Sequence, residues 1–238
     1  MPRTDRRDPE LCVILPSYNE AEIIESVIEG WCGELERLEI EYEIRIYDAA
    51  STDGTVEILR SIAQRNPRIH TIVEKRLPHG SACLRGYTEA TADWVFQTDS
   101  DNEMGPGAFE ELWSERHEYD LLLGCRMGRV STIPRCLVTK VSRLSVTLLF
   151  GTGIRDVNTP YRLMRRSTLR EIIEGVREDT VAPNVIISGL MRRMNKRIYQ
   201  CDVPHQSRAE GSAGLVGLRL IWLASRCFIQ TVAAAVRR

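Results

Sequence analysis

Three acidic residues follow one apolar run at alternate positions, and this spacing is the strongest chemical signal in the chain. The run covers residues 94–97 and leads into Asp99, Asp101 and Glu103. Carboxylates this close repel one another and raise each other's pKa values. A divalent cation relieves that repulsion, and ligands that are all oxygen favour Mg²⁺ or Mn²⁺, with water and phosphate oxygens completing the shell. The calcium loop of the EF-hand type is excluded because its aspartate and glutamate pattern is missing.

Two other apolar runs also end in polar residues. The first is followed by residues 16–20, and the second by Asp48 and residues 49–55. A carboxylate at a strand end can accept a hydrogen bond from a ribose hydroxyl or a nucleobase N–H, so we interpret Asp48 as a ligand contact. Asp53 has the simpler interpretation of a helix cap.

The elements that position these residues alternate between short β-branched runs and helical patterns, which is typical of βαβ units. Strands are predicted at residues 11–15, 43–47, 69–73, 94–97 and 121–124, and helices at 20–38 and 55–64. An irregular stretch at 151–160, helices at 167–174 and 183–193 and a strand at 197–203 follow. In an open parallel sheet, ligands bind beyond the carboxyl ends of the strands, so the polar strand ends should meet.

The 238 residues suit one α/β domain with a mostly parallel central sheet, over residues 1–212, and an amphipathic helix over 213–238. No apolar run of about 18 residues is present to span a membrane. In the last helix Arg226 and Gln230 share one side, whereas Trp222 and Ile229 lie on another. This helix fits a membrane interface and fits equally well against the domain or a partner chain.

Composition and the absence of certain motifs argue against several classes of function. The formal net charge of -1 and the few aromatic residues argue against nucleic-acid binding. The seven cysteines are scattered without a CxxC pair, as in a cytoplasmic protein with reduced thiols, and the first ten residues are too charged for a secretory signal. No GxGxxG or Walker motif points to a dinucleotide enzyme or P-loop NTPase. We expect a cytoplasmic protein, with peripheral contact to the cytoplasmic membrane face as an extension.

In order and spacing, these segments resemble the family 2 glycosyltransferases of the GT-A fold, and within them the polyprenyl-phosphate sugar synthases similar to dolichol-phosphate mannose synthase. The matching segments are residues 13–20, 48–55, 80–86, 99–103, 124–126, 156–166 and 208–212. Two segments depart from the pattern. Residues 48–55 read D-A-A-S-T-D-G-T where the family has D-D-G-S-T-D-G-T, and residues 159–162 read T-P-Y-R in place of S-G-F-R.

The resemblance implies a role for each matching site residue. The donor would be held by Pro16, Tyr18, Glu20, Asp48 and Asp99, and the metal by Asp99, Asp101 and Glu103. The last position is usually glutamine in the lipid-phosphate branch. An acceptor phosphate would be bound by Arg126, Arg135 and Arg208.

The implied reaction transfers a hexose, with inversion, from a GDP- or UDP-sugar to a polyprenyl (dolichyl-type) monophosphate. A phosphate nucleophile is already ionised at neutral pH, whereas a hydroxyl acceptor needs a base. Asp101 and Asp156 are the candidate catalytic residues, although Asp156 has the equal alternative of a salt-bridged aspartate. The lipid would be reached through the C-terminal helix or a membrane partner protein.

Two alternatives stay open. The chain could be a glycosyltransferase of the same fold that acts on a glycan or small-molecule hydroxyl. It could also be a catalytically silent protein that binds sugar nucleotides.

Overall fold

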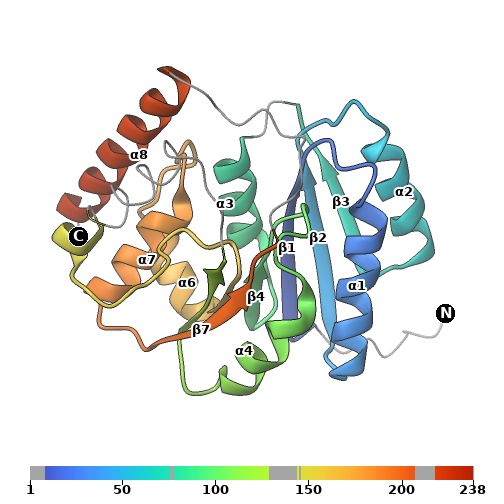
Figure 1. The fold of residues 1–238 in the computed structure, drawn as a ribbon, viewed down its shortest axis with the longest axis horizontal. Helices are drawn as coiled ribbons and strands as arrows, with labels where there is room; N and C mark the ends of the chain where they lie inside the picture. The colour runs from blue at the N-terminus through green and yellow to red at the C-terminus, as the bar shows by residue number, and fades with distance from the viewer. Residues whose placement is uncertain (1–8, 76–77, 129–143, 145, 207–217, 238) are drawn as a thin grey trace.

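The structure is a computed structural model that describes residues 9–75, 78–128, 144, 146–206 and 218–237 (Figure 1). Its centre is a seven-stranded sheet in the order β3-β2-β1-β4-β6-β5-β7. The strands are β1 (Leu11–Ser17), β2 (Tyr42–Asp48), β3 (Ile69–Val73), β4 (Trp94–Gln97), β5 (Leu121–Met127), β6 (Arg162–Arg165) and β7 (Ile198–Pro204). Only β6 runs antiparallel to its neighbours. The expected mostly parallel α/β sheet is confirmed.

Helices cover both faces of this sheet (Figure 1). They are α1 (Ile24–Arg37), α2 (Thr55–Arg65), α3 (His79–Glu89), the 3₁₀ turn η1 (Pro106–Ala108), α4 (Phe109–Glu115), α6 (Arg166–Ile173), α7 (Pro183–Arg193) and α8 (Leu218–Arg237). Alternate residues of β1 enter two separate cores, one with α1 and α2 and the other with α3, α6 and α7. Because β1 is buried on both faces, it appears in the sequence as one continuous apolar run.

The predicted strands all occur, and β3 and β4 have the predicted bounds. β1 continues two residues beyond the prediction, through Pro16. The pairing of β1 with β4 stops at Ile14, so the missing N–H of Pro16 leaves no gap in the sheet. β6 was not predicted, since its four residues, RLMR, carry no β-branched or alternating pattern.

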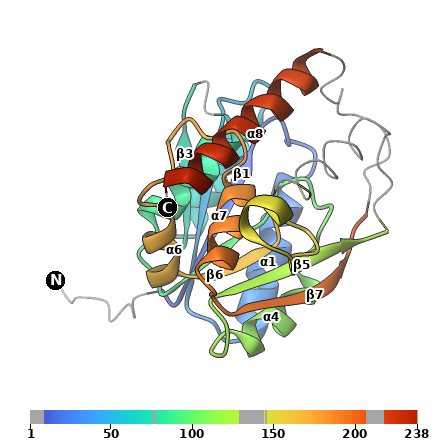
Figure 2. The ribbon, with the colours of Figure 1, turned by 90° about the vertical axis from the view of Figure 1, so that its left-hand side faces the viewer.

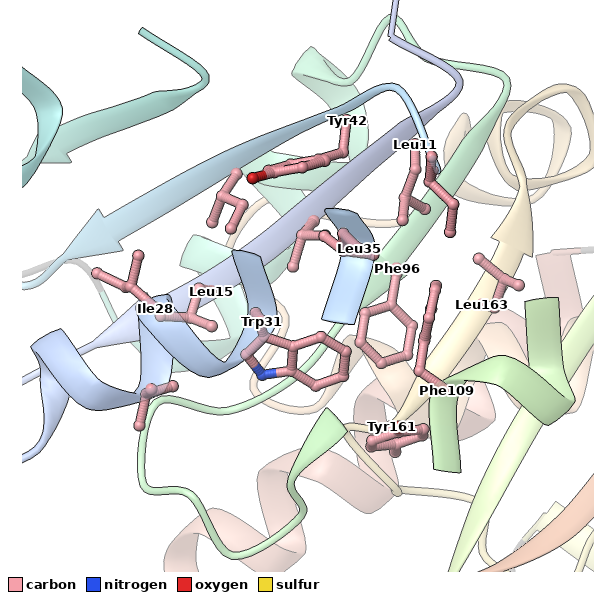
Figure 3. Close-up of a cluster of buried hydrophobic side chains, with 14 of the residues drawn as sticks. Leu11, Leu15, Ile28, Trp31, Leu35, Tyr42, Phe96, Phe109, Tyr161 and Leu163 are labelled. Atoms are coloured by element: carbon pink, nitrogen blue, oxygen red, sulfur yellow. The ribbon is translucent and has the colours of Figure 1, made fainter. Parts of the chain in front are cut away.

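An aromatic cluster supports the end of β4 (Figure 3). The Trp31 ring of α1 lies 5.0 Å from Phe96 and 5.7 Å from Phe109, between ring centroids, and Tyr161 lies 4.9 Å from Phe96. Such tilted and edge-on pairs contribute about 0.5–1.5 kcal/mol each beyond the burial of their area. The cluster therefore anchors the strand that carries the acidic residues to α1, to α4 and to the approach to β6.

The C-terminal helix α8 lies across α7 (Figure 2). The side that faces the domain carries polar and small apolar residues: Arg226 donates to Asp179, Gln230 accepts from the N–H of Val181, and Ala235 is buried in the core. Its apolar side points outward, leaving Trp222 56% and Ile229 65% exposed. Among the described helices, none is both long and apolar enough to cross a bilayer. The proposed division at residues 212 and 213 falls outside the described residues and stays a prediction.

Ala50, in the loop after β2, has a left-handed backbone with φ of 57°. A residue with a Cβ pays about 1–2 kcal/mol for this conformation, whereas glycine adopts it freely. The family resemblance puts a glycine at this position. The loop therefore keeps its shape at the expense of local strain.

We expect Ala50→Gly to raise the free energy of unfolding by about 0.5–1 kcal/mol, because relief of strain exceeds the added entropy of the unfolded chain. Urea denaturation followed by circular dichroism measures the change. Ala49→Gly is the matched control, since Ala49 is not among the residues with positive φ. The control should lose stability, and a loss in both variants would contradict the assignment of strain.

Candidate active site

A cleft of about 1060 Å³ opens where β1, β2 and β4 end. It is lined by Pro16, Ser17, Tyr18, Glu20, Tyr47, Ala49, Ala50, Lys75, Pro78, His79, Ala82, Asp99, Ser100 and Asp101. The chain leaves β1 toward β2 on one side and reaches β4 on the other, so the cleft lies at the switch point of the sheet. This is where open α/β sheets bind their ligands. The expectation that polar strand ends meet in space is met.

The loops after β1 and β2 are joined into one wall of this cleft. The N–H of Asn19 donates to Ser51 Oγ at 2.8 Å, and the N–H of Thr52 returns a bond to Asn19 Oδ1 at 2.9 Å. Asp53 accepts hydrogen bonds from the N–H groups of Ala21 and Thr55. Asp53 therefore connects the two loops just before α2. The N-cap of α2 is Gly54, so Asp53 has a structural role but not the predicted one of the helix cap.

Apart from Asp99, the predicted donor-binding residues occupy two kinds of position. Pro16, Tyr18 and Glu20 line the cleft, with Tyr18 57% exposed at its rim. Asp48 is fully buried behind the wall, and its oxygens accept bonds from the N–H of Ser51 at 2.8 Å and from its hydroxyl at 2.6 Å. The structure therefore separates Asp48 from the open cleft, although its neighbours Ala49 and Ala50 line it.

Two of the three predicted metal ligands lie together on the cleft. Burial, together with the nearby carboxylates of Asp99, Glu103 and Glu20, raises the pKa of Asp101 to about 6. His79 Nε2 lies 3.8 Å from Asp99 Oδ1. The cleft also holds the buried hydroxyl of Ser17, which has no hydrogen-bond partner in the described part of the chain.

A divalent cation fits this group of oxygens. The cation would offset the burial and the carboxylate repulsion that make ionised Asp101 costly, and Ser17 adds a neutral oxygen. No three His, Cys, Asp or Glu side chains of the described chain are grouped as a complete metal site. Mg²⁺ commonly uses one or two carboxylates and takes its remaining oxygens from substrate phosphates and water. The donor set therefore suits a cation that arrives with a diphosphate.

Glu103 does not line the cleft. Its carboxylate lies 2.9 Å from His205 Nε2, next to a second cavity of about 530 Å³. The His205 side chain is only 4% exposed, and its Nδ1 has no hydrogen-bond partner among the residues that the structure describes. Sequence reasoning missed His205. His205 directly follows β7, so a search of the residues after β7, like that made after β1, β2 and β4, would have identified this histidine.

Arg126 and Asp156 form a bidentate ion pair at the end of β5, with N–O distances of 2.7 and 2.9 Å. Burial opposes ionisation of Asp156, but the hydrogen bonds and charge of Arg126 outweigh it and hold the pKa of this carboxyl below its usual value. Asp99 and Glu103 act electrostatically on Arg126 as well. Of the other predicted acceptor residues, Arg135 and Arg208 lie outside the described residues.

We expect Asp101→Asn to stabilise the metal-free protein by about 1–3 kcal/mol at pH 7.5, in the presence of a chelator. The raised pKa means that the folded protein binds a proton at Asp101 more tightly than the unfolded chain does. The wild type therefore loses stability as the pH rises from about 4 to above 6. The advantage of the variant should disappear below about pH 4, which thermal unfolding at several pH values measures.

Asp93→Asn is the control for charge alone, since the Asp93 side chain is 84% exposed. It should change the unfolding temperature little at any pH. Added Mn²⁺ should then stabilise the wild type more than Asp101→Asn. An equal response of these two proteins to Mn²⁺ would argue against a cation at Asp101.

The sequence of this chain is similar to those of known glycosyltransferases. The family model described as glycosyl transferase family 2 matches residues 12–173. Undecaprenyl-phosphate 4-deoxy-4-formamido-L-arabinose transferase of Proteus mirabilis is 26% identical over 215 residues, which are 89% of this chain and 64% of that protein. The enzyme of the same name from Photorhabdus laumondii is 24% identical over 89% of this chain and 65% of its own length. The chain thus spans about two thirds of these relatives.

Solved structures show the same architecture. A mannosyltransferase from Pyrobaculum calidifontis in complex with GDP-Man and Mn²⁺ has a TM-score of 0.64 at 22% identity, covering 98% of this chain and 65% of its own. Glucosyl-3-phosphoglycerate synthase from Mycobacterium tuberculosis, in complex with Mn²⁺, UDP-Glc and phosphoglyceric acid, has a TM-score of 0.70 at 18% identity, covering 96% and 80%. These likenesses establish the GT-A fold. Because the family model covers most of the chain, the protein belongs to glycosyl transferase family 2.

Proposed function

We propose that this protein is a metal-dependent, inverting hexosyltransferase that uses a GDP- or UDP-sugar and a polyprenyl monophosphate acceptor. The observation that carries the proposal is the pair Asp99 and Asp101 on the cleft at the switch point of the sheet. Lipid phosphate as the acceptor is supported by the two bacterial relatives, which are named undecaprenyl-phosphate transferases.

The donor would lie in the large cleft, with its nucleoside against Pro16, Tyr18 and Glu20. The exposed Tyr18 ring can stack on a base, and the joined loops offer a rigid wall. Asp48 would reach the nucleoside only after a base or ribose group replaces Ser51 at its oxygens. Until then it holds in place the loop that lines the cleft.

The diphosphate would lie at Asp99 and Asp101, with Mg²⁺ or Mn²⁺ as the cofactor. When bound, the cation neutralises negative charge that develops on the leaving diphosphate. Glu103 would join this group only by giving up its contact with His205. Lys75 and His79 line the same cleft and add positive charge where phosphates would lie.

In the reaction, an oxygen of the acceptor phosphate forms a bond to the anomeric carbon while the bond from that carbon to the diphosphate oxygen breaks. The bonding electrons leave with the nucleoside diphosphate, and attack from the opposite face inverts the configuration. A phosphate acceptor is already anionic, so the step needs no general base.

The state of Asp156 favours a phosphate acceptor over a hydroxyl. Both of its carboxylate oxygens are bonded to Arg126, and its pKa is lowered, so it is poorly suited to accept a proton. Arg126, with Arg135 and Arg208, would hold the acceptor phosphate. We therefore assign Asp156 to positioning Arg126.

The exposed apolar side of α8 supports a peripheral position on the cytoplasmic face of a membrane, where the lipid would be found. Trp222, Phe228, Ile229 and Val236 are all exposed along this helix. Aromatic and aliphatic side chains of this kind anchor helices in the headgroup region. A membrane partner protein is the other route to the lipid.

The deciding assay incubates the purified protein with a short polyprenyl phosphate, Mg²⁺ or Mn²⁺ and a panel of GDP- and UDP-sugars. We expect release of nucleoside diphosphate that depends on the lipid and falls roughly 100-fold or more in Asp101→Ala, because the charge of the leaving group loses its counterion. Turnover with sugar hydroxyls but not with lipid would favour a soluble acceptor. Donor binding without any turnover would favour a silent binding protein.

Asp156→Asn separates the positioning role from that of a base. As a positioning residue, it should raise KM for the lipid phosphate and leave the shape of the pH profile of kcat unchanged. The variant should also lose about 3 kcal/mol of stability, since it leaves Arg126 without its buried partner. Loss of the acidic limb of the kcat profile would instead identify Asp156 as a base.

A further inference from the structure

A buried amide lies directly behind Asp99. Gln97 is the last residue of β4 and is completely buried. Its Nε2 donates to Asp99 Oδ1 at 3.3 Å. His79 approaches the same oxygen, at 3.8 Å. Asp99 Oδ2 receives no hydrogen bond from the residues that the structure describes, so this oxygen is left for a ligand in the cleft.

Two further buried side chains hold Gln97 in this orientation. Tyr87 of α3 has its hydroxyl 2.7 Å from Gln97 Oε1 and 2.7 Å from Asn184 Oδ1, so its single proton can serve either. Asn184 of α7 donates through Nδ2 to Gln97 Oε1 at 2.7 Å. Because Gln97 Oε1 accepts these bonds, its amide nitrogen must point the other way, toward Asp99.

Arg162 extends this network below Asn184. It is completely buried and donates to the backbone oxygens of Asn184, Val157 and Thr159. The start of α7, the strand β6 and the loop before it are thereby tied together. The orientation of Asn184 is fixed from two sides as a result.

Such a network is costly to place in a core. Each buried polar group must be hydrogen-bonded, and an apolar packing of similar volume would serve stability as well or better. The hydrogen-bonded side chains of Asn184, Tyr87 and Gln97 are all buried. Asp99, which accepts from Gln97, is the member of this series that lines the cleft. The network therefore meets the cleft at the Asp99 carboxylate, which is proposed to bind the metal.

We propose that Gln97 is a positioning residue that sets the Asp99 carboxylate for the metal-bound diphosphate, and that Tyr87 and Asn184 lock Gln97 in its donating orientation. This inference rests on the proposed function, because it assigns a purpose to Asp99. It goes further by naming three residues that never touch the substrate. It also links α7, in the second half of the chain, to the donor site.

The test is direct titration of Mn²⁺ in the presence of the nucleoside diphosphate that the wild type binds, following free Mn²⁺ by electron paramagnetic resonance. This readout needs no lipid acceptor and no turnover. Gln97→Met keeps the size of the side chain but cannot donate to Asp99. We expect its Mn²⁺ affinity to fall about 10- to 100-fold, the usual loss when an outer partner of a metal ligand is removed. Tyr87→Phe should weaken binding in the same direction by a smaller factor.

Ser188→Ala is the matched control. Ser188 lies one helical turn after Asn184, is completely buried and donates to the backbone oxygen of Val157. Its loss removes a buried hydrogen bond of the same helix, while Val157 keeps the bond that Arg162 donates to the same oxygen. The bonds from Asn184 and Tyr87 to Gln97, and from Gln97 to Asp99, do not involve Ser188. This variant should bind Mn²⁺ as the wild type does, and each variant's unfolding midpoint shows that it is folded. If Gln97→Met does not fold, Tyr87→Phe carries the test.

Kinetics supply a second readout. A positioning role predicts a raised Mn²⁺ requirement for Gln97→Met, with kcat largely recovered at saturating Mn²⁺. Mn²⁺ affinity equal to that of the wild type in both network variants would overturn the inference, as would an equal loss in Ser188→Ala. If the wild type itself bound no Mn²⁺ with nucleotide, the metal site of the proposed function would fail first, and the inference with it.

Discussion

The mutual repulsion of carboxylates at the end of β4 is the constraint around which the rest of this structure is arranged. Asp99 and Asp101 are held at the carboxyl end of the sheet because β4, the strand before them, is buried on both faces. The aromatic cluster of Trp31, Phe96 and Phe109 fixes that strand against α1 and α4. Packing thus overcomes an electrostatic cost, which a cation and its diphosphate would later relieve.

The charged side chains on the two sides of Asp99 and Asp101 differ in whether they have partners within the protein. On the donor side the acidic residues face an open cleft and stay available to a ligand. On the side of β5 and β7, the acidic side chains already have partners within the protein: Asp156 pairs with Arg126, and Glu103 lies against the His205 ring. In the proposed reaction, the second side would exchange these internal partners for a charged acceptor, whereas the first side would gain a partner only when the donor arrives.

The sequence predicted the elements with strong local patterns and missed those that depend on distant contacts. Six parallel strands followed from short apolar or β-branched runs, and the polar ends of β1, β2 and β4 led to the cleft. β6 could not be recognised, because Arg162 is buried by backbone oxygens from elsewhere in the fold. In the same way, only tertiary contacts show that His205 holds Glu103 and that α8 turns Arg226 and Gln230 toward the domain. Propensity describes none of these pairings.

The antiparallel strand β6 has a consequence for how the chain acquires its fold. It pairs with β4 on one side and with β5 on the other, yet it follows both in the sequence. Until residue 165 has been synthesised, two apolar strands keep unpaired edges that can associate with other chains. Joining them requires contacts between distant segments, which form slowly. The step most exposed to misassembly is therefore the late insertion of one short strand into the middle of the sheet.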